Sequence, residues 1–489
     1  MCCENNKKVR TRFAPSPTGF MHVGNLRTAL YAYLLAKSCG GDFVLRIEDT
    51  DQARYVEGAV DVIYATLARA GLIHDEGPDK PGCCGPYIQS ERRELYGEYA
   101  RKLVESGHAY YCFCEKHEAA EDEEETIQDA GEVCPCRSMD PAESAALAAS
   151  GKPCVIRQKI DRSGVSVFRD SVFGEITIEN KVLDDQILLK SDGMPTYNFA
   201  NVVDDHLMGI THVVRGSEYL SSTPKYNLLY EAFNWEIPTY VHLPLIMGRD
   251  AEGNVSKLSK RHGSVSFENL VAEGYLPEAI VNYIALLGWS PKSDREIFTL
   301  AELGEAFKVS GLNKSPAVFD YEKLRWMNSE YIKTLDFERF ASLAKPFAKL
   351  EGTALEGKWD SIAALLHSRT EVFSEIPEKI GFLVEQPEYS VELFCHKKSK
   401  SDVENTRTDL PEVRARLAEL TEWNAENISG VLSGFAAEKE VKAGRPMWQV
   451  RIAVSGCAVT PGGPGEIMEI LGKDESLARI DKALRKLAL

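Results

Sequence analysis

The sequence lacks any run of about 18 consecutive apolar residues, the length that a membrane-spanning helix requires. Its opening residues, MCCENNKKVRTRF, contain neither the apolar segment nor the small-residue cleavage site of a secretory signal. Positive charge is also scarce, because 57 Lys and Arg stand against 74 Asp and Glu and give a formal net charge of −17. We therefore expect a cytoplasmic protein that neither enters a membrane nor coats DNA, although a local basic face for one polyanion remains compatible with the sequence.

Repeats are missing too. No internal repeat with a period of about 20 to 50 residues is present, and the 36 Gly and 22 Pro follow no period. With 489 residues, of which 44% are hydrophobic and 27% charged, the composition is that of a folded protein with about three domains. Fibrous and largely disordered chains are excluded.

Two common nucleotide-binding signatures are absent. No G-x-G-x-x-G follows the first predicted strand, which argues against a dehydrogenase. The Gly-rich segment TPGGPGEIMEILGKDE near the C-terminus has neither the spacing nor the Ser or Thr of a P-loop. A nucleotide site in this chain must be built in another way.

An alternation of strand and helix patterns begins the chain. Residues 7–14 alternate as in a strand, and the PSPTG segment ends it because its prolines remove backbone donors. Apolar residues then recur at helical spacing from Asn25, a suitable N-cap, up to a Gly pair. A strand at 43–51 and a helix at 56–70 follow. This order predicts a parallel α/β sheet that binds a nucleotide.

The pattern changes twice further along the chain. Cysteine pairs, an acidic run and short strand-like pieces occupy about residues 111–190, which we interpret as an insertion that splits the α/β domain. Alternation then resumes, with a helix at about 224–233. Beyond about residue 321 the sequence becomes almost wholly helical, which predicts a separate all-α domain.

Two short motifs suit a polyphosphate. The residues His22-Val23-Gly24-Asn25 lie where the first helix begins, so backbone N–H groups and the positive end of the helix dipole face any anion in front of it. The run Lys257-Leu258-Ser259-Lys260-Arg261 places three cations in five residues. Strand ends meet at one rim of an α/β sheet, so the two motifs could hold a triphosphate from opposite sides. Taken singly, the first could be a simple helix entry and the second a solvated basic loop.

Four of the 12 cysteines form the pattern C-x-C-x19-C-x-C: Cys112, Cys114, Cys134 and Cys136. Four thiolates suit a tetrahedral Zn²⁺, and in a reducing compartment this pattern favours a metal over disulfides. The zinc would be structural, because four protein ligands leave no open position for a substrate. The alternative is four reduced cysteines without a metal.

One acidic motif is interpreted as structural. The run Asp204-Asp205-His206 has the residue types of a metal or acid–base set. Adjacent residues of a strand, however, point to opposite faces of a sheet. We therefore predict no catalytic role for it.

Four blocks of this sequence resemble the class I glutamyl-tRNA synthetases, in the order that the family has them: RFAPSPTGFMHVGNLRTALYAYLLAK, RIEDTDQARYVEGA, DGMPTYNFANVVDDHLMGITHVVRGSEYLSSTP and KLSKRHG. HVGN corresponds to the "HIGH" signature of class I synthetases, and KLSKR corresponds to their "KMSKS" signature. Asn25 replaces the final His of the general pattern, at a position that varies in this family. The resemblance runs from about residue 9 to the C-terminus.

The resemblance implies an α/β fold with a Rossmann-like class I catalytic domain, split by an insertion and followed by an all-α, anticodon-binding domain. It also assigns the segments. Residues 1–110 and 191–255 would be the two halves of the catalytic domain, 111–190 the connective insertion with the zinc site, 256–325 the KLSKR loop and stem-contact region, and 326–489 the helical domain.

For glutamate, a selective site needs two fixed cations and one acid, because the substrate has two carboxylates and one ammonium. The resemblance implies that Arg12 binds the side-chain carboxylate, Arg215 the α-carboxylate and Glu48 the ammonium; which arginine holds which end is left open. Neutral hydrogen bonds would come from Ser16, Tyr197 and Asn201. Each residue could instead be structural, with the arginines in internal ion pairs, Glu48 paired with Arg46 and Tyr197 in the core.

For ATP, the resemblance implies contacts from six residues: Ala14, His22, Gly24, Glu218, Lys257 and Lys260. His22 and Gly24 would contact the phosphates, Ala14 and Glu218 the adenosine, and the two lysines would act from the loop. The catalytic residues would be His22, Lys257 and Lys260. No general base is needed, because the substrate carboxylate attacks the α-phosphate directly while Mg²⁺ assists in neutralising charge.

The activity implied by the resemblance is ATP-dependent formation of glutamyl-adenylate and transfer of glutamate to tRNA-Glu by a monomer. Transfer to tRNA-Gln as well is left open. Two alternatives stay open. A glutaminyl-tRNA synthetase would share the catalytic fold, but its relatives usually carry a β-rich anticodon domain, whereas this C-terminal third is helical. A catalytically inactive, tRNA-binding regulatory relative is disfavoured by the intact HVGN and KLSKR motifs.

Overall fold

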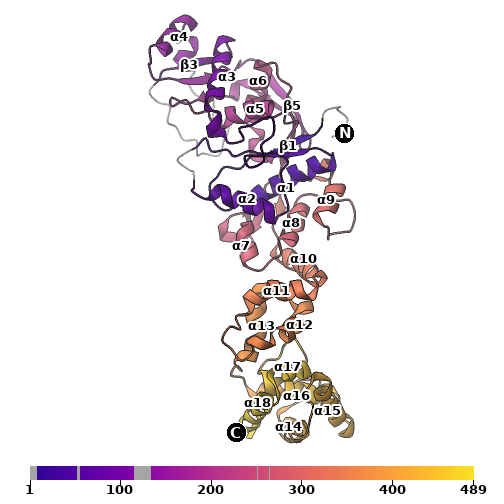
Figure 1. Cartoon of the computed structure of the whole chain (residues 1–489). Helices are drawn as coiled ribbons and strands as arrows, with labels where there is room; N and C mark the ends of the chain where they lie inside the picture. Colours follow the sequence, from indigo (N-terminus) through magenta and orange to yellow (C-terminus); the bar gives the residue numbers. More distant parts are fainter. Residues whose placement is uncertain (1–7, 52–55, 115–133, 251, 264, 489) are drawn as a thin grey trace. The chain divides into compact units, whose positions relative to one another are not determined.

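The structure is a computed structural model of the chain, and it describes residues 8–51, 56–114, 134–250, 252–263 and 265–488. The chain divides into two compact units (Figure 1). The first unit holds the residues up to Val271 together with Pro277–Tyr321, and the second holds Ala272–Leu276 and the residues from Glu322 onwards. No described helix combines the length and the apolar character that crossing a membrane demands.

The first unit begins with a strand, a helix and a parallel strand. Strand β1 (Arg10–Phe13) pairs in parallel with β2 (Asp42–Leu45), and helix α1 (Val23–Ser38) connects them. The strand predicted at 7–14 is therefore confirmed, while the strand predicted at 43–51 is shorter than expected. Only glycine fits at position 41, because a Cβ there would lie 2.1 Å from the carbonyl oxygen of Val9.

Helix α1 begins two residues earlier than the sequence indicated. Its N-cap is His22, whose Nδ1 accepts a hydrogen bond from the backbone N–H of Gly24 at 3.0 Å. The prediction of Asn25 as the N-cap is wrong, because the imidazole of His22 takes the part that an Asn side chain usually plays. The helix predicted at 56–70 is present as α2 (Ala59–Arg69).

A second, four-stranded sheet has the order β6-β5-β9-β8. Strands β8 (His212–Gly216) and β9 (Thr239–Leu243) are parallel, and β5 (Val165–Asp170) joins β9 in parallel where Asp170 meets Tyr240. Strand β6 (Gly174–Glu179) forms an antiparallel hairpin with β5. The hairpin of the segment interpreted as an insertion thus extends the sheet that carries β8 and β9.

Three helices pack together in one buried core of the first unit: α3 (Arg93–Glu105), α5 (Tyr197–Leu207) and α6 (Thr223–Ala232). Helix α6 confirms the helix predicted at 224–233. The expectation that Asp204-Asp205-His206 belongs to a strand is wrong, because these residues end α5. The aromatic residues Tyr96, Phe199 and Tyr226 are almost fully buried in this core, so its packing fixes the face that α5 presents.

The remaining elements of the first unit are short. A three-stranded sheet of β3, β4 and β7 carries the first cysteine pair, and another of β11, β10 and β12 carries the KLSKR motif. Their bounds, with those of the helices beside them, are β3 (Ala109–Cys112), α4 (Pro141–Ala149), β4 (Val155–Gln158), β7 (Ile187–Leu189), β10 (Ile246–Arg249), β11 (Val255–Lys257), α7 (Phe267–Ala272), α8 (Pro277–Leu286), α9 (Leu300–Ala306) and β12 (Ala317–Val318).

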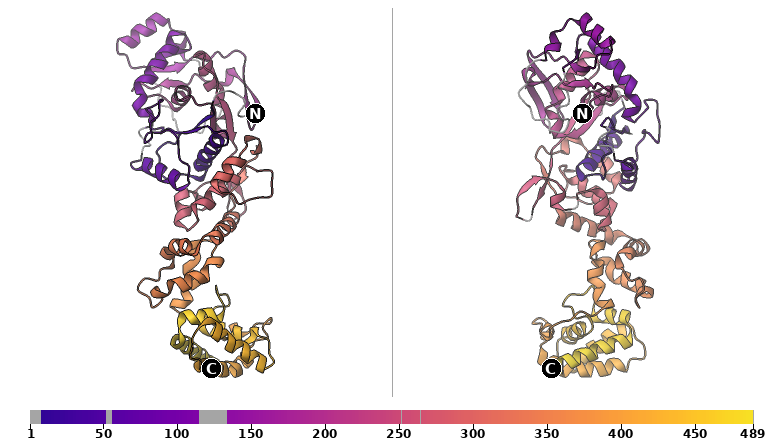
Figure 2. Two further views of the ribbon diagram at one scale, coloured as in Figure 1. Left: turned by 45° about the vertical axis from the view of Figure 1, so that its right-hand side comes forward. Right: turned by 90° about the vertical axis from the view of Figure 1, so that its left-hand side faces the viewer.

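The second unit consists of helices and loops in the residues that the structure describes, as the orange and yellow ribbons show from two further sides (Figure 2). The helical pattern in FERFASLAKPFAKL is present as α11, so the prediction of an all-α C-terminal domain is confirmed. The helices are α10 (Tyr321–Thr334), α11 (Phe337–Ala348), α12 (Trp359–Leu366), α13 (Ile376–Val384), α14 (Val403–Ala418), α15 (Ala425–Glu438), α16 (Gly444–Ser455), α17 (Pro464–Leu471) and α18 (Lys473–Ala488). The finer domain boundaries stay predictions.

Candidate active site

Arg12 lies on β1 and is buried against α5 and β8. Its Nε donates to both carboxylate oxygens of Asp205, at 3.1 and 3.3 Å, and its Nη1 donates to the carbonyl oxygen of Val214 at 3.3 Å. Within the described part of the chain, no partner is recorded for Nη2. One edge of the guanidinium can therefore still bind a ligand carboxylate.

Glu48 follows β2 and is also buried. Its Oε1 accepts from Arg46 Nη2 at 2.9 Å, so the pairing with Arg46 that the sequence left open is present. Burial raises the pKa of Glu48 above its ordinary value, although the charges of Arg46 and Arg12 oppose this rise. The carboxylate is therefore incompletely stabilised by its protein neighbours, and an added cation beside it would be favourable.

The acidic pair of α5 holds this cluster together. Asp205 accepts from Arg46 Nη1 at 2.7 Å as well as from Arg12, while Asp204 accepts from Arg92 Nε at 2.7 Å. Two neutral groups, the Gln89 amide at 2.9 Å and the Tyr96 hydroxyl at 2.8 Å, also donate to Asp204. These contacts fit the structural role predicted for the two acids. Asp204 and Asp205, however, are consecutive residues of a helix and not of a strand.

The buried charges of this cluster balance. Three arginines, Arg12, Arg46 and Arg92, face three carboxylates, Glu48, Asp204 and Asp205. Burial alone would raise the pKa of Asp205, but the neighbouring guanidinium groups of Arg12 and Arg46 lower it overall. A balanced set of this kind adds rigidity without adding net charge to the site.

Arg215, on β8, is in a different environment. Its Nε donates to His242 Nε2 at 3.0 Å and its Nη2 to Thr223 Oγ1 at 2.8 Å, and no carboxylate of the described chain forms an ion pair with it. The aromatic rings of Tyr226 and Tyr240 lie 4.7 and 5.1 Å from the guanidinium carbon. Arg215 is therefore a buried cation without a carboxylate partner among the described residues.

His242 connects Arg215 to an acid. The two residues are register partners on β8 and β9, and His242 Nδ1 lies 2.7 Å from Asp170 Oδ2. All three side chains are buried. Burial lowers the pKa of His242 to about 4, because the hydrogen bond with Asp170 only partly compensates for it. The imidazole is therefore neutral at pH 7. Because it lies between Asp170 and Arg215, these two charged groups do not meet directly.

The predicted neutral contacts lie close to these charges. Tyr197 and Asn201 are one helical turn apart on α5, so they share a face. Asn201 is buried, and its Nδ2 has no hydrogen-bond partner in the described residues. Burial raises the pKa of Tyr197, and Glu48 adds to the rise, which places the phenol near that carboxylate. Ser16 is exposed in the loop after β1.

The two signature motifs come together at the start of α1. The backbone N–H of Val23 donates to the carbonyl of Val265 at 2.8 Å, so the residues that follow KLSKR are fixed to the helix entry. His22 pairs with Ser266 in an isolated bridge. Burial and the nearby Lys257 charge both lower the pKa of His22 below its ordinary value. The expectation that one site uses both motifs is consistent with this geometry.

The KLSKR loop is shaped by a histidine that the sequence analysis did not select. The ring of His262 packs against Gly248, where a Cβ would lie 2.5 Å from it, and His262 Nδ1 accepts from the backbone N–H of Ser259 at 3.1 Å. Lys257 ends β11 with an exposed side chain. Lys260 begins the 3-10 turn Lys260–His262, but its side chain lies outside the described structure.

The remaining ATP residues are more accessible. Ala14 is half-buried immediately after β1, and Gly24 is half-buried in the first turn of α1. Glu218 is exposed in the 3-10 turn Ser217–Leu220, which directly follows β8 and therefore Arg215. Ala14 and Glu218 thus directly follow the strands that carry Arg12 and Arg215.

The four cysteines converge as predicted. Their Sγ atoms all lie within 4.8 Å of one another, with separations of 3.1 Å for Cys112 to Cys134 and 3.7 Å for Cys114 to both Cys134 and Cys136. Four sulfur atoms each about 2.3 Å from one Zn²⁺ would be separated by similar distances. The donor set therefore fits a structural zinc ion, although residues 115–133 between the pairs lie outside the described structure.

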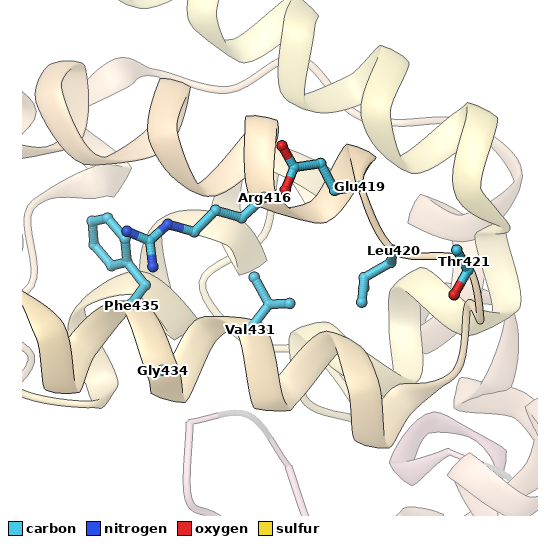
Figure 3. A pocket seen from close by; sticks show the side chains of 7 residues that line it. All are labelled: Arg416, Glu419, Leu420, Thr421, Val431, Gly434 and Phe435. Carbon is cyan, nitrogen blue, oxygen red and sulfur yellow. The ribbon is translucent and has the colours of Figure 1, made fainter.

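A hollow of about 360 Å³ lies elsewhere, between α14 and α15 of the second unit (Figure 3). Arg416 crosses it, with its guanidinium carbon 5.3 Å from the centre of the Phe435 ring. The same guanidinium donates to Glu438 and Glu412. Its charge is already matched by two acids, so this hollow has no unmatched charge for an anionic substrate.

Arg92, His242 and Asp170 are the contributors that the sequence analysis missed. Arg92 holds Asp204 from 112 positions away, and Asp170 reaches His242 across 72 positions. The one signal in the sequence was that His242 is a polar residue within the strand-like segment TYVHL, which forms β9. Such pairings depend on strand order, which sequence spacing does not reveal.

Comparison with known proteins is consistent with this geometry. The family described as "tRNA synthetases class I (E and Q), catalytic domain" matches residues 8–326, and the family described as "Anticodon binding domain" matches residues 339–484. A glutamate–tRNA ligase of Clostridium botulinum is 55% identical over 488 residues, covering 98% of this chain and 99% of the relative. A glutamate–tRNA ligase of Clostridium kluyveri is 54% identical over 489 residues, covering 99% of each chain.

Solved structures give the same result. The crystal structure of a glutamate tRNA ligase from Elizabethkingia meningosepticum, in complex with its amino acid, matches with a TM-score of 0.85 at 34% identity. It covers 98% of this chain and 100% of that chain. A glutamate-tRNA synthetase from Elizabethkingia anophelis matches with the same TM-score at 33% identity. The likeness therefore extends over both units.

Proposed function

This chain belongs to the class I tRNA synthetases for glutamate and glutamine, and from that premise we propose how its residues carry out the reaction of a glutamate–tRNA ligase. The reaction joins L-glutamate to tRNA with ATP, first forming glutamyl-adenylate and pyrophosphate. Arg12, Arg215 and Glu48 bind the amino acid. The glutamine-specific alternative is not favoured, because the similar proteins over the full length are glutamate ligases.

The observation that carries the choice of glutamate is the state of Arg215. It is a buried guanidinium surrounded by tyrosine rings and a neutral imidazole, with no carboxylate partner in the described chain, and it adds a second cation to the open Nη2 edge of Arg12. The two carboxylates of glutamate would complete both sites. Glutamine would bring an α-carboxylate to one cation but only a neutral amide to the other, and sites built on such pairing reject the analogue by large factors.

The other groups fit the rest of the amino acid. Arg12 offers its Nη2 edge to the second carboxylate, and Glu48 offers its incompletely stabilised carboxylate to the ammonium. Asn201 has a buried Nδ2 donor that lacks a partner, while Tyr197 and Ser16 supply hydroxyl groups. We assign Arg12 to the side-chain carboxylate, which glutamine lacks, and Arg215 to the α-carboxylate. The exchange of these two roles would move the discrimination against glutamine from Arg12 to Arg215.

ATP binds along the start of α1. The backbone of Gly24 and the ring of His22 face the phosphates, Lys257 and Lys260 act from the other side, and Ala14 and Glu218 lie near the adenosine. Glutamate attacks the α-phosphate in line, so these residues work by positioning and by neutralising charge on the leaving pyrophosphate. Mg²⁺, when bound with ATP, would supply further charge neutralisation.

The same proposal covers zinc, location and assembly. The sulfur cluster of Cys112, Cys114, Cys134 and Cys136 holds a structural Zn²⁺ that organises the β3 region, with no part in the chemistry. The protein works in the cytoplasm, where tRNA and ATP are available. It acts as a monomer.

Lys260→Ala should slow adenylate formation by about 100-fold while changing the KM for glutamate less than about threefold. A loop lysine that meets the leaving group acts mainly in the transition state, so its loss lowers the rate more than it weakens substrate binding. Single-turnover formation of glutamyl-adenylate, with tRNA present, gives both values. Lys308→Ala, which removes an exposed lysine of the same unit, serves as the control. An unaltered single-turnover rate would remove Lys260 from the mechanism.

Charging of purified tRNAs with labelled glutamate tests the function as a whole. We expect tRNA-Glu to be charged in an ATP-dependent reaction. Charging of tRNA-Gln as well would define a non-discriminating enzyme that requires a later amidation step. If neither tRNA is charged while a reference ligase charges both samples, the chain is the inactive regulatory relative instead.

A further inference from the structure

We propose that Asp170 and His242 form a positioning chain that orients Arg215 and thereby sets how tightly Arg215 binds the α-carboxylate of glutamate. The inference rests on the proposed role of Arg215 in glutamate binding and adds two residues to it. Arg215 Nε lies 3.0 Å from His242 Nε2, and His242 Nδ1 lies 2.7 Å from Asp170 Oδ2. The three groups thus form one continuous hydrogen-bonded line from a cation to an anion.

The donors and acceptors of this line can have only one arrangement. A guanidinium has no acceptor, so Arg215 Nε donates and His242 Nε2 must accept. The single proton of the neutral imidazole is then on Nδ1, which donates to Asp170. Loss of the acid would remove the reason for this tautomer. A proton moved to Nε2 would point at the Arg215 N–H and break the contact.

Asp170 accepts three backbone hydrogen bonds in addition to the one from the imidazole. Its Oδ1 accepts from the backbone N–H groups of Val172 and Phe173, both at 2.8 Å, and its Oδ2 also accepts from the backbone N–H of His242 at 3.1 Å. Burial by itself would raise the pKa of Asp170, but these hydrogen bonds and the one from the imidazole lower it overall. The acid is therefore a stationary anion that holds the ring in place.

The length of the chain explains why Arg215 stays available to the substrate. An aspartate bonded directly to Arg215 would occupy the guanidinium and compete with the substrate carboxylate. Placed one imidazole away, Asp170 balances the buried charge but leaves the arginine edge that carries Nη1 without a partner in the described residues. Thr223 holds Nη2 at 2.8 Å, so the guanidinium keeps one orientation. The site then offers a charged, fixed and open edge to the α-carboxylate of glutamate.

The position of Asp170 gives the connective segment a part in amino-acid binding. Asp170 is the last residue of β5, and β5 reaches β9 only at the pairing of Asp170 with Tyr240. The segment interpreted from the sequence as an insertion therefore contributes a group to the glutamate site. It does so through His242, without contacting the substrate.

The test uses Asp170→Asn in the full-length enzyme. The KM for glutamate should rise at least about tenfold, as expected when a hydrogen bond to a charged group is lost, and discrimination against glutamine should change little, because both amino acids carry the α-carboxylate. The KM for ATP should stay within about twofold, because the chain ends at Arg215. Asp170→Glu, which keeps the anion, should recover part of the loss. His242→Leu, which removes both contacts, should be at least as impaired as Asp170→Asn.

The matched control is Asp79→Asn, since Asp79 also accepts from a histidine, His74 Nε2, at 2.7 Å but belongs to another part of the unit. Nitrogen NMR of the wild type should show His242 protonated at Nδ1. Equal rises in both KM values, or an unchanged glutamate KM in Asp170→Asn, would overturn the inference while the charging activity of the wild type upholds the function. Absence of wild-type charging would instead overturn the function.

Discussion

Replacing Arg215 by alanine should raise the KM for glutamate by about 30- to 4,000-fold, which corresponds to about 2 to 5 kcal/mol for truncating one partner of a buried charge pair. The variant loses the cation that would meet the α-carboxylate of the substrate. Glutamine carries the same α-carboxylate, so its own kcat/KM should fall by a similar factor and the discrimination ratio should change little. Initial rates of tRNA charging at varied glutamate and glutamine concentrations give both quantities.

The Arg215 experiment separates binding from folding by two further variants. Arg215→Lys keeps the charge but loses the planar fork, so its KM should fall between those of the wild type and Arg215→Ala. Arg169→Ala removes an exposed arginine of the neighbouring strand β5 and should behave as the wild type. A glutamate KM in Arg215→Ala within about threefold of the wild type, with an unchanged KM for ATP, would contradict the assignment.

The residues of the catalytic elements were predictable from the sequence because they lie in local patterns. The strand at 7–14, the helix at 56–70 and the helical C-terminal third follow from apolar periodicity and from turn residues. The misplaced N-cap shows a limit of that approach. A histidine ring capped α1, where the sequence rule expects a short polar side chain such as that of Asn25.

The predicted site residues are brought together by the fold, but their partners could not be foreseen. Arg12, Glu48 and Arg215 lie in recognisable motifs, whereas the groups that hold them are distant in sequence. Asp205 is 193 positions from Arg12, and His242 is 27 positions from Arg215 on another strand. These pairings follow from the order β5-β9-β8 and from the face of α5 that packing selects. Neither the strand order nor the packed face of α5 can be predicted from the spacing of neighbouring residues in the sequence.

The run Asp204-Asp205-His206 shows that a predicted role can fit the structure although the secondary structure assumed for it was wrong. Its interpretation as structural is consistent with the contacts, but the argument from strand geometry was wrong because α5 is a helix. On consecutive positions of a helix, the two acids still reach different arginines. The arginines approach from β1, from the end of β2 and from the 3-10 turn that precedes α3, so the acids join three elements that sequence patterns treat separately.

Asp205→Ala should therefore lower the free energy of unfolding of the first unit by about 3 to 5 kcal/mol, the cost of leaving a buried charge without its partner. Arg12 and Arg46 would both lose a carboxylate, at 3.1 and 2.7 Å respectively. Urea unfolding at pH 7 measures the change. Asp61→Ala, which removes an exposed acid of α2, should alter stability by no more than about 0.5 kcal/mol.

The pH dependence of this difference gives a second, independent check. The pKa of Asp205 is lowered in the folded state, so its stabilising effect is fully present above the pKa of an unfolded aspartate, about 3.9, and is lost as the pH falls through the folded value. The gap between the wild type and Asp205→Ala should be constant from pH 7 to about pH 5 and should narrow below about pH 4. A gap that stays constant down to pH 3 would mean that packing of the Asp205 side chain, and not its charge, stabilises the cluster, and the balanced set of three arginines and three acids would then not explain the rigidity of the site.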